Sequence, residues 1–390
     1  MAEQGTGFVD VATAVAELQA GRMIVVVDDE DRENEGDLMV AAEFCTPEVV
    51  NFMARFGRGL ICLALTEERA DALRLGPMTQ DNTSRFGTAF TESIEAREGV
   101  TTGISAADRA HTIHVAISPG STPGDLARPG HVFPLRARKG GVLVRAGQTE
   151  ASVDLARMAG LIPAGVICEV MKDDGTMARV PDLIEFCAEH GLKMVTVAEI
   201  IRYRLQHERY IRRVAEAQLP TEFGEFRMIV YESEVEGGES HVALVYGDVD
   251  AKNNDAPVLV RVHTHCLAGN VFGATLCDCR ATVDGSLRSV VAAGRGAVVY
   301  LHHTQRGFGI DRTVPGGRLG FHRDLRRNEG AGERDQRILR QVGLGGQILS
   351  DLGIRKITLL SNHPTHVPAL QGFGIEIVGQ AAIPLERVGK

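Results

Sequence analysis

A run of carboxylates follows directly after an apolar segment near the start of the chain. The apolar residues 23–27 predict a buried strand, and the next ten, DDEDRENEGD at residues 28–37, contain seven carboxylates. Like charges at this density repel one another unless a cation lies among them, and a hard cation such as Mg²⁺ takes oxygen ligands. A charge run is usually a solvated surface loop. Because this run abuts a buried strand and ends at Gly36 and Asp37, its position favours an active site that binds a metal.

Three cysteines in the second half of the chain have the spacing of a metal site. Cys266, Cys277 and Cys279 form a C-x10-C-x-C pattern. In an intracellular chain this pattern favours a zinc site with three protein ligands and one open position. The alternative is three unpaired thiols. We therefore expect Zn²⁺ to bind in the second half of the chain.

The elements that would carry these residues alternate in the first half and change character near residue 205. Apolar runs and helical spacing predict strands at 23–27, 59–65, 112–117, 141–144, 166–171 and 194–197, and helices at 47–56, 150–160 and 181–190. This mixed order indicates an α+β or layered α/β domain. A charged helical pattern runs from residue 197 to about 217 and breaks at residues 219–221. Strand-like residues 226–231 open a second unit, so we place an α/β domain at residues 1–208 and a smaller α+β domain at residues 209–390.

Composition argues against several classes of partner. The 390 residues suffice for two ordinary domains, and 44% hydrophobic with 24% charged residues is typical of soluble globular protein. A net charge of −9, the absence of Trp and 5% aromatic residues argue against a nucleic-acid partner. No apolar run approaches the roughly 18 residues of a membrane helix, and the N-terminal residues lack the features of a signal peptide. Seven cysteines without such a signal argue against a disulfide framework, so we expect a cytoplasmic protein without a membrane partner.

Several segments of the first half resemble one enzyme family. Besides the acidic loop, four segments agree with it in order: NTS at 82–84, EGVTTGISAADR at 98–109, RPGHVFPLR at 128–136 and DDGTMAR at 173–179. On these motifs, residues 8–208 resemble 3,4-dihydroxy-2-butanone 4-phosphate synthase. The resemblance implies conversion of D-ribulose 5-phosphate to 3,4-dihydroxy-2-butanone 4-phosphate and formate, with Mg²⁺ or Mn²⁺ as cofactor. It also implies a homodimer, because this synthase fold usually builds its site at a dimer interface.

The resemblance also assigns roles to individual residues. Carried over position by position, metal ligation falls on Glu33, substrate contact on Arg32 and Asp37, proton transfer on His131 and Glu169, and phosphate binding on Arg145 and Thr149. An imidazole suits acid and base chemistry near neutral pH, and a guanidinium suits an oxyanion. An isolated histidine is often structural. The flanking Arg-Pro-Gly and Phe-Pro of His131 predict a fixed turn and favour function.

One metal ligand of the family pattern is replaced in this chain. The family reads R-x-G-H-T-E-A, and residues 145–151 read RAGQTEA, so Gln148 stands where the second metal ligand, a histidine, is expected. An amide oxygen can ligate Mg²⁺ but brings no charge and accepts no proton. Three alternatives stay open: a tolerated substitution with weaker metal binding, an engineered inactivating change, or a drifted enzyme. The other motif residues are retained, which favours a working synthase.

The second half resembles GTP cyclohydrolase II over residues 209–385. Its RVHTHCLAGN and CDC segments are similar to the family patterns R-V-H-S-E-C-L-T-G-D and C-D-C. The resemblance implies that the three cysteines bind Zn²⁺, which activates water for attack on the guanine ring of GTP with release of formate, while another step cleaves pyrophosphate from GTP.

Other positions of the second half depart from that family. His265 replaces a Glu, Thr282 a Gln and Gly332 an Asp, HTQRG at 303–307 replaces Q-E-G-R-G, and the segment around residues 362–364 lacks a Lys pair. Glycine cannot transfer a proton, so these changes predict a degenerate domain that binds zinc without hydrolysing GTP. The alternatives are a bifunctional enzyme that also hydrolyses GTP, and a tail that senses a nucleotide or docks a partner.

Overall fold

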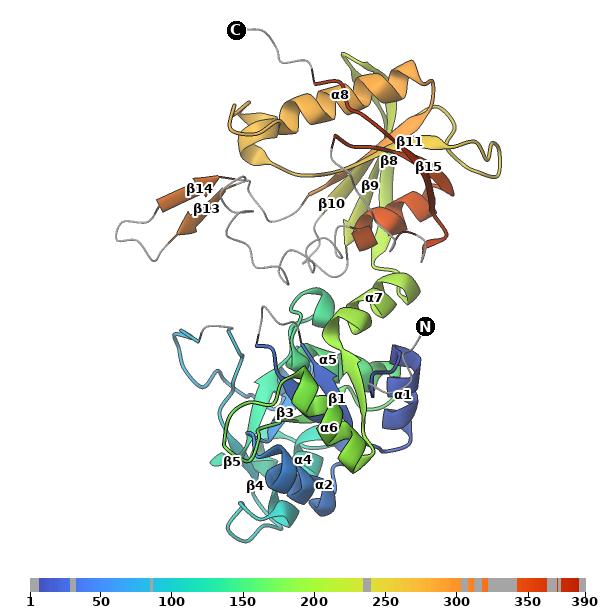
Figure 1. Ribbon diagram of the computed structural model, residues 1–390. Helices are drawn as coiled ribbons and strands as arrows, with labels where there is room; N and C mark the ends of the chain where they lie inside the picture. Colours follow the sequence, from blue (N-terminus) through green and yellow to red (C-terminus); the bar gives the residue numbers. More distant parts are fainter. Residues whose placement is uncertain are drawn as a thin grey trace. The chain divides into compact units, whose positions relative to one another are not determined.

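The computed structural model of the chain divides into two compact units, residues 1–203 and 204–390 (Figure 1). It describes residues 7–28, 33–84, 87–233, 240–302, 308–311, 318–321, 342–362, 370 and 373–385. Each unit combines one large sheet with helices, which confirms the predicted α+β and α/β fold class. The functional boundary at residues 208 and 209 stays a prediction. None of the helices described is long and apolar enough to cross a membrane.

The first unit is built on a seven-stranded mixed sheet with the order β4-β5-β3-β6-β2-β1-β7. Its strands are β1 (Ile24–Val27), β2 (Gly36–Ala41), β3 (Cys62–Leu65), β4 (Ile94–Ala96), β5 (Leu126–Arg136), β6 (Ala164–Glu169) and β7 (Lys193–Thr196). The pairs β1–β7 and β3–β5 are parallel, and the other neighbours are antiparallel. The central strands β1, β2 and β3 are buried along their whole length. A sheet with helices on both faces gives such continuous apolar strands.

Helices cover both faces of this sheet. They are α1 (Val11–Gln19), α2 (Pro47–Phe52), α3 (Glu67–Ala72), α4 (Ala106–Ile117), α5 (Gln148–Met158), α6 (Val180–His190) and α7 (Val197–His207). Helices α2, α4 and α6 share one apolar cluster with Val25, Leu38 and Leu63 of the strands. Helix α5 packs on the opposite face, where a Cβ at Gly165 would lie 2.7 Å from Ser152 Cβ. Glycine in β6 therefore lets α5 approach the sheet closely.

The predicted strands at 112–117 and 141–144 are wrong. Residues 112–117 form the second half of α4, whose first turn is capped by the Ser105 hydroxyl, an acceptor for the Asp108 N–H. Ala110, Ile113 and Ile117 of this helix are buried at helical spacing, so packing overrides the strand preference of the β-branched residues. Residues 141–143 form a short 3-10 helix. Strands β2, β4 and β5 were not predicted.

The second unit contains another seven-stranded sheet, with the order β16-β15-β11-β12-β10-β9-β8. The strands are β8 (Ile211–Thr221), β9 (Gly224–Ser233), β10 (Ser240–Tyr246), β11 (Val258–Thr264), β12 (Gly296–Leu301), β15 (Lys356–Leu360) and β16 (Glu376–Ala381), and β13 (Phe308–Asp311) pairs separately with β14 (Arg318–Phe321). Helix α8 (Cys279–Ala292) packs on one face, and residues 342–351 form a helix on the other. The helix predicted to reach residue 217 is wrong, because α7 ends at His207 and the exposed edge strand β8 begins at Ile211. The charged residues of this segment favoured a helix in the sequence, but antiparallel pairing with β9 makes it a strand.

Candidate active sites

In the first unit, the described part of the acidic loop from Glu33 onward turns around the side chain of Asp28, at the end of β1. Its carboxylate oxygens accept hydrogen bonds from the backbone N–H of Glu35 at 2.9 Å and of Glu33 at 3.2 Å. Asn34 between them has a left-handed backbone, with φ of 54°, a conformation that Asn adopts more easily than most residues. The turn therefore holds Glu33 and Glu35 beside Asp28. Arg32, a predicted substrate contact, lies outside the described residues.

Asp37 and Glu169 face one another across the antiparallel strands β2 and β6. Asp37 is only 5% exposed, and burial raises its pKa well above the usual range, with the charges of Glu169 and Glu33 adding to the effect. Burial also raises the pKa of Glu169, although the Leu60 N–H donates to its Oε2 at 2.8 Å. A Cβ at Gly59 would lie 2.5 Å from that same oxygen, so the position is restricted to glycine. The pair is thus held rigidly, and burial and the neighbouring carboxylates disfavour the charged form of both groups.

Gln148 lies at the same cluster, as the first residue of α5. Its side chain is buried, and its Nε2 donates to the Glu35 backbone oxygen at a long distance of 3.5 Å. The pKa of Glu35 is raised by burial and by the charge of Glu33. Asp37, Glu169 and Glu35 thus form a cluster of three carboxyls with raised pKa values. A hard divalent cation binds carboxylate oxygens and would stabilise their charged forms. The structure therefore brings together the predicted metal-binding positions, Glu33 and Gln148, and these residues fit Mg²⁺ or Mn²⁺.

The cation nearest to the acidic loop among the described contacts is Arg179, which the sequence did not single out. Its guanidinium donates to the backbone oxygens of Glu33, at 2.8 Å, and of Asn34. It also lies 4.0 Å from the Glu35 carboxylate and lowers the pKa of that group, in part offsetting the effect of burial. Arg179 ends the DDGTMAR segment, so its place in a family motif was the available clue. It fixes the loop conformation and supplies positive charge.

The predicted phosphate-binding residues flank the N-terminus of α5. Thr149 is buried in the first turn of this helix, whose N-cap is Gly147. Backbone N–H groups at a helix N-terminus favour an anion. Arg145 donates to the Glu150 carboxylate at 2.7 Å, and Glu150 is 1% exposed. This ion pair fixes the guanidinium beside the same helix end.

His131 belongs to a different pair of strands. On β5, its Nδ1 lies 2.7 Å from Glu95 Oε2 on β4. Strand β3 separates β5 from β6, so His131 is about 10 Å from the Glu169 strand. Glu95 was not predicted, and it is closely confined because a Cβ at Gly103 would lie 2.0 Å from its carboxyl carbon. The contacts described for this chain therefore place His131 with Glu95, and not with the Asp37–Glu169 pair.

A buried thiol beside the carboxylate pair was also missed. Cys62 on β3 is the cross-strand partner of Ile167 on β6. Its pKa is raised by burial and then by the charges of Glu169 and Asp37. The thiol is therefore protonated at neutral pH and contributes a neutral wall to the site. Its short buried strand resembles any core segment in the sequence, so no pattern distinguished it.

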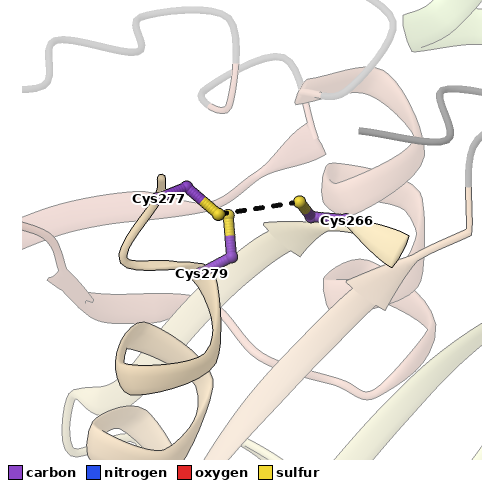
Figure 2. A group of neighbouring side chains, drawn as sticks. All are labelled: Cys266, Cys277 and Cys279. Atoms are coloured by element: carbon purple, nitrogen blue, oxygen red, sulfur yellow. Dashed lines mark hydrogen bonds between the residues drawn. The ribbon is translucent and has the colours of Figure 1, made fainter. Parts of the chain in front are cut away.

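The cysteines of the second unit converge as predicted (Figure 2). The sulfurs of Cys266, Cys277 and Cys279 all lie within 4.8 Å of one another, and those of Cys266 and Cys277 are 3.8 Å apart. Thiolates at about 2.3 Å from a tetrahedral zinc lie about 3.8 Å from each other. Burial and the neighbouring sulfurs raise the pKa of Cys279, so a cation would be needed to hold this residue as a thiolate. The cluster fits zinc.

Gly269 makes this convergence possible. Its N–H donates to Cys266 Sγ at 3.3 Å, the kind of hydrogen bond that stabilises a thiolate. A Cβ at this position would lie 2.4 Å from Cys277 Sγ and 3.3 Å from Cys266 Sγ. Any larger residue would therefore separate the sulfurs. The loop closes around the cluster only with glycine here.

Two of the positions that depart from the cyclohydrolase pattern lie near these cysteines in the described residues. His265 precedes Cys266, and its Nδ1 lies 2.8 Å from the Tyr300 hydroxyl. Thr282 is on the first turn of α8 and donates its N–H to the Asp278 carbonyl. The departures at 303–307 and at Gly332, and most of the segment at 362–364, lie outside the described residues.

Two family models match the chain in succession. The model for 3,4-dihydroxy-2-butanone 4-phosphate synthase matches residues 12–203, and the model for GTP cyclohydrolase II matches residues 212–382. Similar proteins named riboflavin biosynthesis protein RibBA include one from Aquifex aeolicus (strain VF5), 52% identical over 97% of this chain and 93% of its own length. Another, from Bacillus subtilis (strain 168), is 48% identical over 97% of this chain and 94% of its own.

Solved structures are similar to the whole chain and to its first unit. A crystal structure of RibBX, described as a two domain 3,4-dihydroxy-2-butanone 4-phosphate synthase from A. baumannii, is 37% identical with a TM-score of 0.77. The match covers 97% of this chain and 100% of the RibBX chain. A 3,4-dihydroxy-2-butanone 4-phosphate synthase in complex with two magnesium ions is 41% identical with a TM-score of 0.50, over 52% of this chain and 99% of its own.

The relatives correct one expectation about the second unit. The cyclohydrolase model spans nearly all of it, and proteins of similar length carry the RibBA name. They do not support the prediction of a degenerate domain, and they favour the bifunctional alternative. The departures at His265 and Thr282 are therefore substitutions within a domain of the cyclohydrolase family.

Proposed function

Because the chain belongs to the RibBA family of riboflavin biosynthesis proteins, we propose that its first domain converts D-ribulose 5-phosphate to 3,4-dihydroxy-2-butanone 4-phosphate and formate. The observation that carries this proposal is the Asp37–Glu169 pair, which lies in a buried acidic cluster. Carboxyls with raised pKa values keep their protons to higher pH than ordinary carboxyls and so suit acid and base roles. The rearrangement of a sugar phosphate requires such proton transfers at several carbons.

Each predicted residue around this pair would have its own role in the reaction. Glu33 and Gln148 would hold Mg²⁺ or Mn²⁺, and the metal would polarise the vicinal carbonyl and hydroxyl oxygens of the sugar. Asp37 would contact a sugar hydroxyl, and Glu169 would move the proton. Arg145, Thr149 and the first turn of α5 would bind the phosphate.

The pairing of His131 with Glu95 fits an acid or base whose ring is held by a carboxylate. Its separation from Glu169 agrees with the homodimer that the resemblance implies, in which a site completed by two chains would bring the two groups together. Analytical ultracentrifugation tests this part of the proposal, with a dimer as the expected result and a monomer with full activity as the contrary one.

Formate release from ribulose 5-phosphate tests the first activity. We expect it to need added Mg²⁺ or Mn²⁺, to stop with EDTA, and to be lost in Asp37→Asn. Asp71→Asn is the matched control, because the Asp71 side chain is 65% exposed on α3 and pairs with Arg136. Full activity in EDTA, or in Asp37→Asn, would contradict the assignment of the acidic cluster.

We further propose that the second domain opens the guanine ring of GTP, with release of formate and pyrophosphate. The convergence of Cys266, Cys277 and Cys279 around a space of the right size for zinc supports this. The three thiolates would hold the ion and leave one position open, where zinc supplies an activated water. The backbone N–H of Gly269 would stabilise one thiolate.

A second candidate for this domain is GTP binding without turnover. The histidine at position 265 and the threonine at position 282 favour it, because neither supplies the carboxylate or amide of the cyclohydrolase pattern. Zinc-loaded protein with GTP distinguishes the two. Formate and pyrophosphate from GTP support the cyclohydrolase, whereas calorimetric binding of GTP without either product supports the second candidate.

A further inference from the structure

The side-chain oxygen of Asn270 lies among three hydrogen-bonding groups beside Cys266. It is 3.1 Å from the Cys266 nitrogen, 3.2 Å from the Tyr300 hydroxyl and 3.3 Å from His263 Nε2. The backbone N–H of Cys266 can only donate, so the amide atom facing it must be the oxygen. The backbone N–H of Asn270 in turn donates to the Cys266 carbonyl at 2.7 Å, so two hydrogen bonds fix the loop between these residues.

This orientation bears on where the protons of the neighbouring groups lie. The Tyr300 hydroxyl donates to the Asn270 oxygen at 3.2 Å, and a hydroxyl has one proton to donate. With that proton directed at Asn270, the Tyr300 oxygen, 2.8 Å from His265 Nδ1, accepts a hydrogen bond from that nitrogen. In this arrangement a neutral His265 carries its proton on Nδ1, and its Nε2 has a free lone pair.

The backbone and the neighbouring rings keep His265 in this arrangement. Its N–H donates to the Leu301 carbonyl at 2.8 Å. Its ring meets the Tyr300 ring edge-on and lies 4.7 Å from the ring of His302, centroid to centroid. The side chain is partly exposed, and within the described part of the chain Nε2 makes no hydrogen bond. The lone pair is thus available to a ligand next to Cys266.

We propose that Asn270 and Tyr300 are positioning residues that hold His265 as the Nδ1–H tautomer, so that its Nε2 accepts a hydrogen bond from a guanine base at the cysteine cluster. Guanine presents two N–H donors on one edge, at N1 and at the 2-amino group, whereas adenine has an acceptor at N1 beside its 6-amino donor. An Nε2 acceptor that faces N1 therefore favours guanine. This role of His265 rests on the proposed action on GTP, but the tautomer itself does not.

Nuclear magnetic resonance of the zinc-loaded full chain tests the tautomer. With ¹⁵N-labelled histidine, long-range ¹H–¹⁵N correlations at pH 8 should show His265 protonated on Nδ1, with assignment by loss of its signals in His265→Gln. Tyr300→Phe removes the acceptor and should shift His265 toward the Nε2–H form that free histidine prefers. Tyr246→Phe, in a separate apolar cluster, should leave it unchanged. Protonation of His265 on Nε2 in the wild type would overturn the proposal.

Nucleotide binding tests the acceptor role. In calorimetry, Tyr300→Phe should weaken GTP binding by about tenfold, the effect of one hydrogen bond, and should leave ATP binding as in the wild type. An unchanged affinity for GTP in that variant would overturn the acceptor role even if GTP is turned over. A wild type that neither binds nor hydrolyses GTP would sink the proposed second activity and the guanine role together, and the resonance experiment would then decide the tautomer alone.

Discussion

Asp37 on β2 lies directly opposite Glu169 on β6, and burial raises the pKa of both carboxyls. Two acidic groups would not be placed together in a sheet for stability, since each disfavours the charged form of the other. The closely packed Gly59 and the hydrogen bond from Leu60 show that the arrangement is specific. The fold therefore keeps two mutually repelling carboxyls in a buried position, an arrangement that is common in active sites.

This arrangement predicts how stability depends on pH. A carboxyl whose pKa is raised by folding binds its proton more tightly in the folded state, so its stabilising effect is complete below the unfolded pKa, about 4. It is lost as pH rises through the raised value. In EDTA, Asp37→Asn should therefore melt above the wild type at pH 8, by about 2–4 °C for each kcal/mol relieved, and the difference should shrink at pH 5.

Magnesium should offset the stability that the wild type loses as the pH rises. Because the ion neutralises the carboxylates, adding Mg²⁺ should raise the melting temperature of the wild type more at pH 8 than at pH 5. Asp37→Asn should respond less. Differential scanning calorimetry measures both, and a wild-type gain that is equal at the two pH values would show that the cluster does not bind the ion.

The acidic loop itself gives a further prediction. Glu33→Gln should abolish formate release from ribulose 5-phosphate while the fold persists, because the cluster loses one charge and gains none. Circular dichroism checks the fold. Glu48→Gln, exposed on α2, is the matched control and should retain full activity. Near-normal turnover in Glu33→Gln would refute its assignment as a metal ligand.

What the sequence could predict depends on how far apart the interacting residues lie in the chain. The acidic run at 28–37 and the cysteines at 266–279 are local patterns, and the structure brings together Asp28, Glu33 and Glu35 of the first and the three cysteines of the second. Glu95 could not be found in this way, because its partner His131 is 36 residues away and only the β4–β5 pairing joins them. The same holds for Arg179, 146 residues from Glu33.

The errors in the fold have the same origin. Residues 112–117 have strand-forming side chains but follow a capped helix start at Ser105, and the buried side of α4 decides their structure. Residues 211–217 look helical but complete the edge of a sheet through β9. In both cases a partner distant in sequence outweighs local preference.

Gly269 gives a prediction for the zinc cluster. Gly269→Ala should lower zinc affinity by about 10- to 100-fold, as disturbing the surroundings of a metal ligand commonly does, because its Cβ would meet Cys277 Sγ. Gly379→Ala on β16, where a Cβ would have open contacts at 4.0 Å, is the control. Competition with a zinc-binding dye measures the affinity. An equal zinc affinity in the wild type, Gly269→Ala and Gly379→Ala would mean that the three cysteines do not bind one metal ion together.

Gln148 gives the last prediction, because it stands at the N-terminus of α5 where an imidazole is expected. Its amide is buried and donates a long hydrogen bond to the Glu35 carbonyl. An amide oxygen on Mg²⁺ would bring no charge and less basicity than a nitrogen donor. We therefore expect an unusually high Mg²⁺ requirement, partly relieved by saturating ribulose 5-phosphate, whose oxygens also bind the ion.

Gln148→His should lower the Mg²⁺ concentration that gives half-maximal formate release by about tenfold or more, in line with the 10- to 100-fold effects of changes around metal ligands. Gln80→His, on an exposed loop, controls for adding a histidine and should change nothing. Identical half-saturation in the wild type and Gln148→His would show that position 148 does not touch the metal. An inactive wild type with a fully active Gln148→His would instead identify position 148 as the single residue that silences this synthase, since the variant keeps every other contact of the acidic cluster.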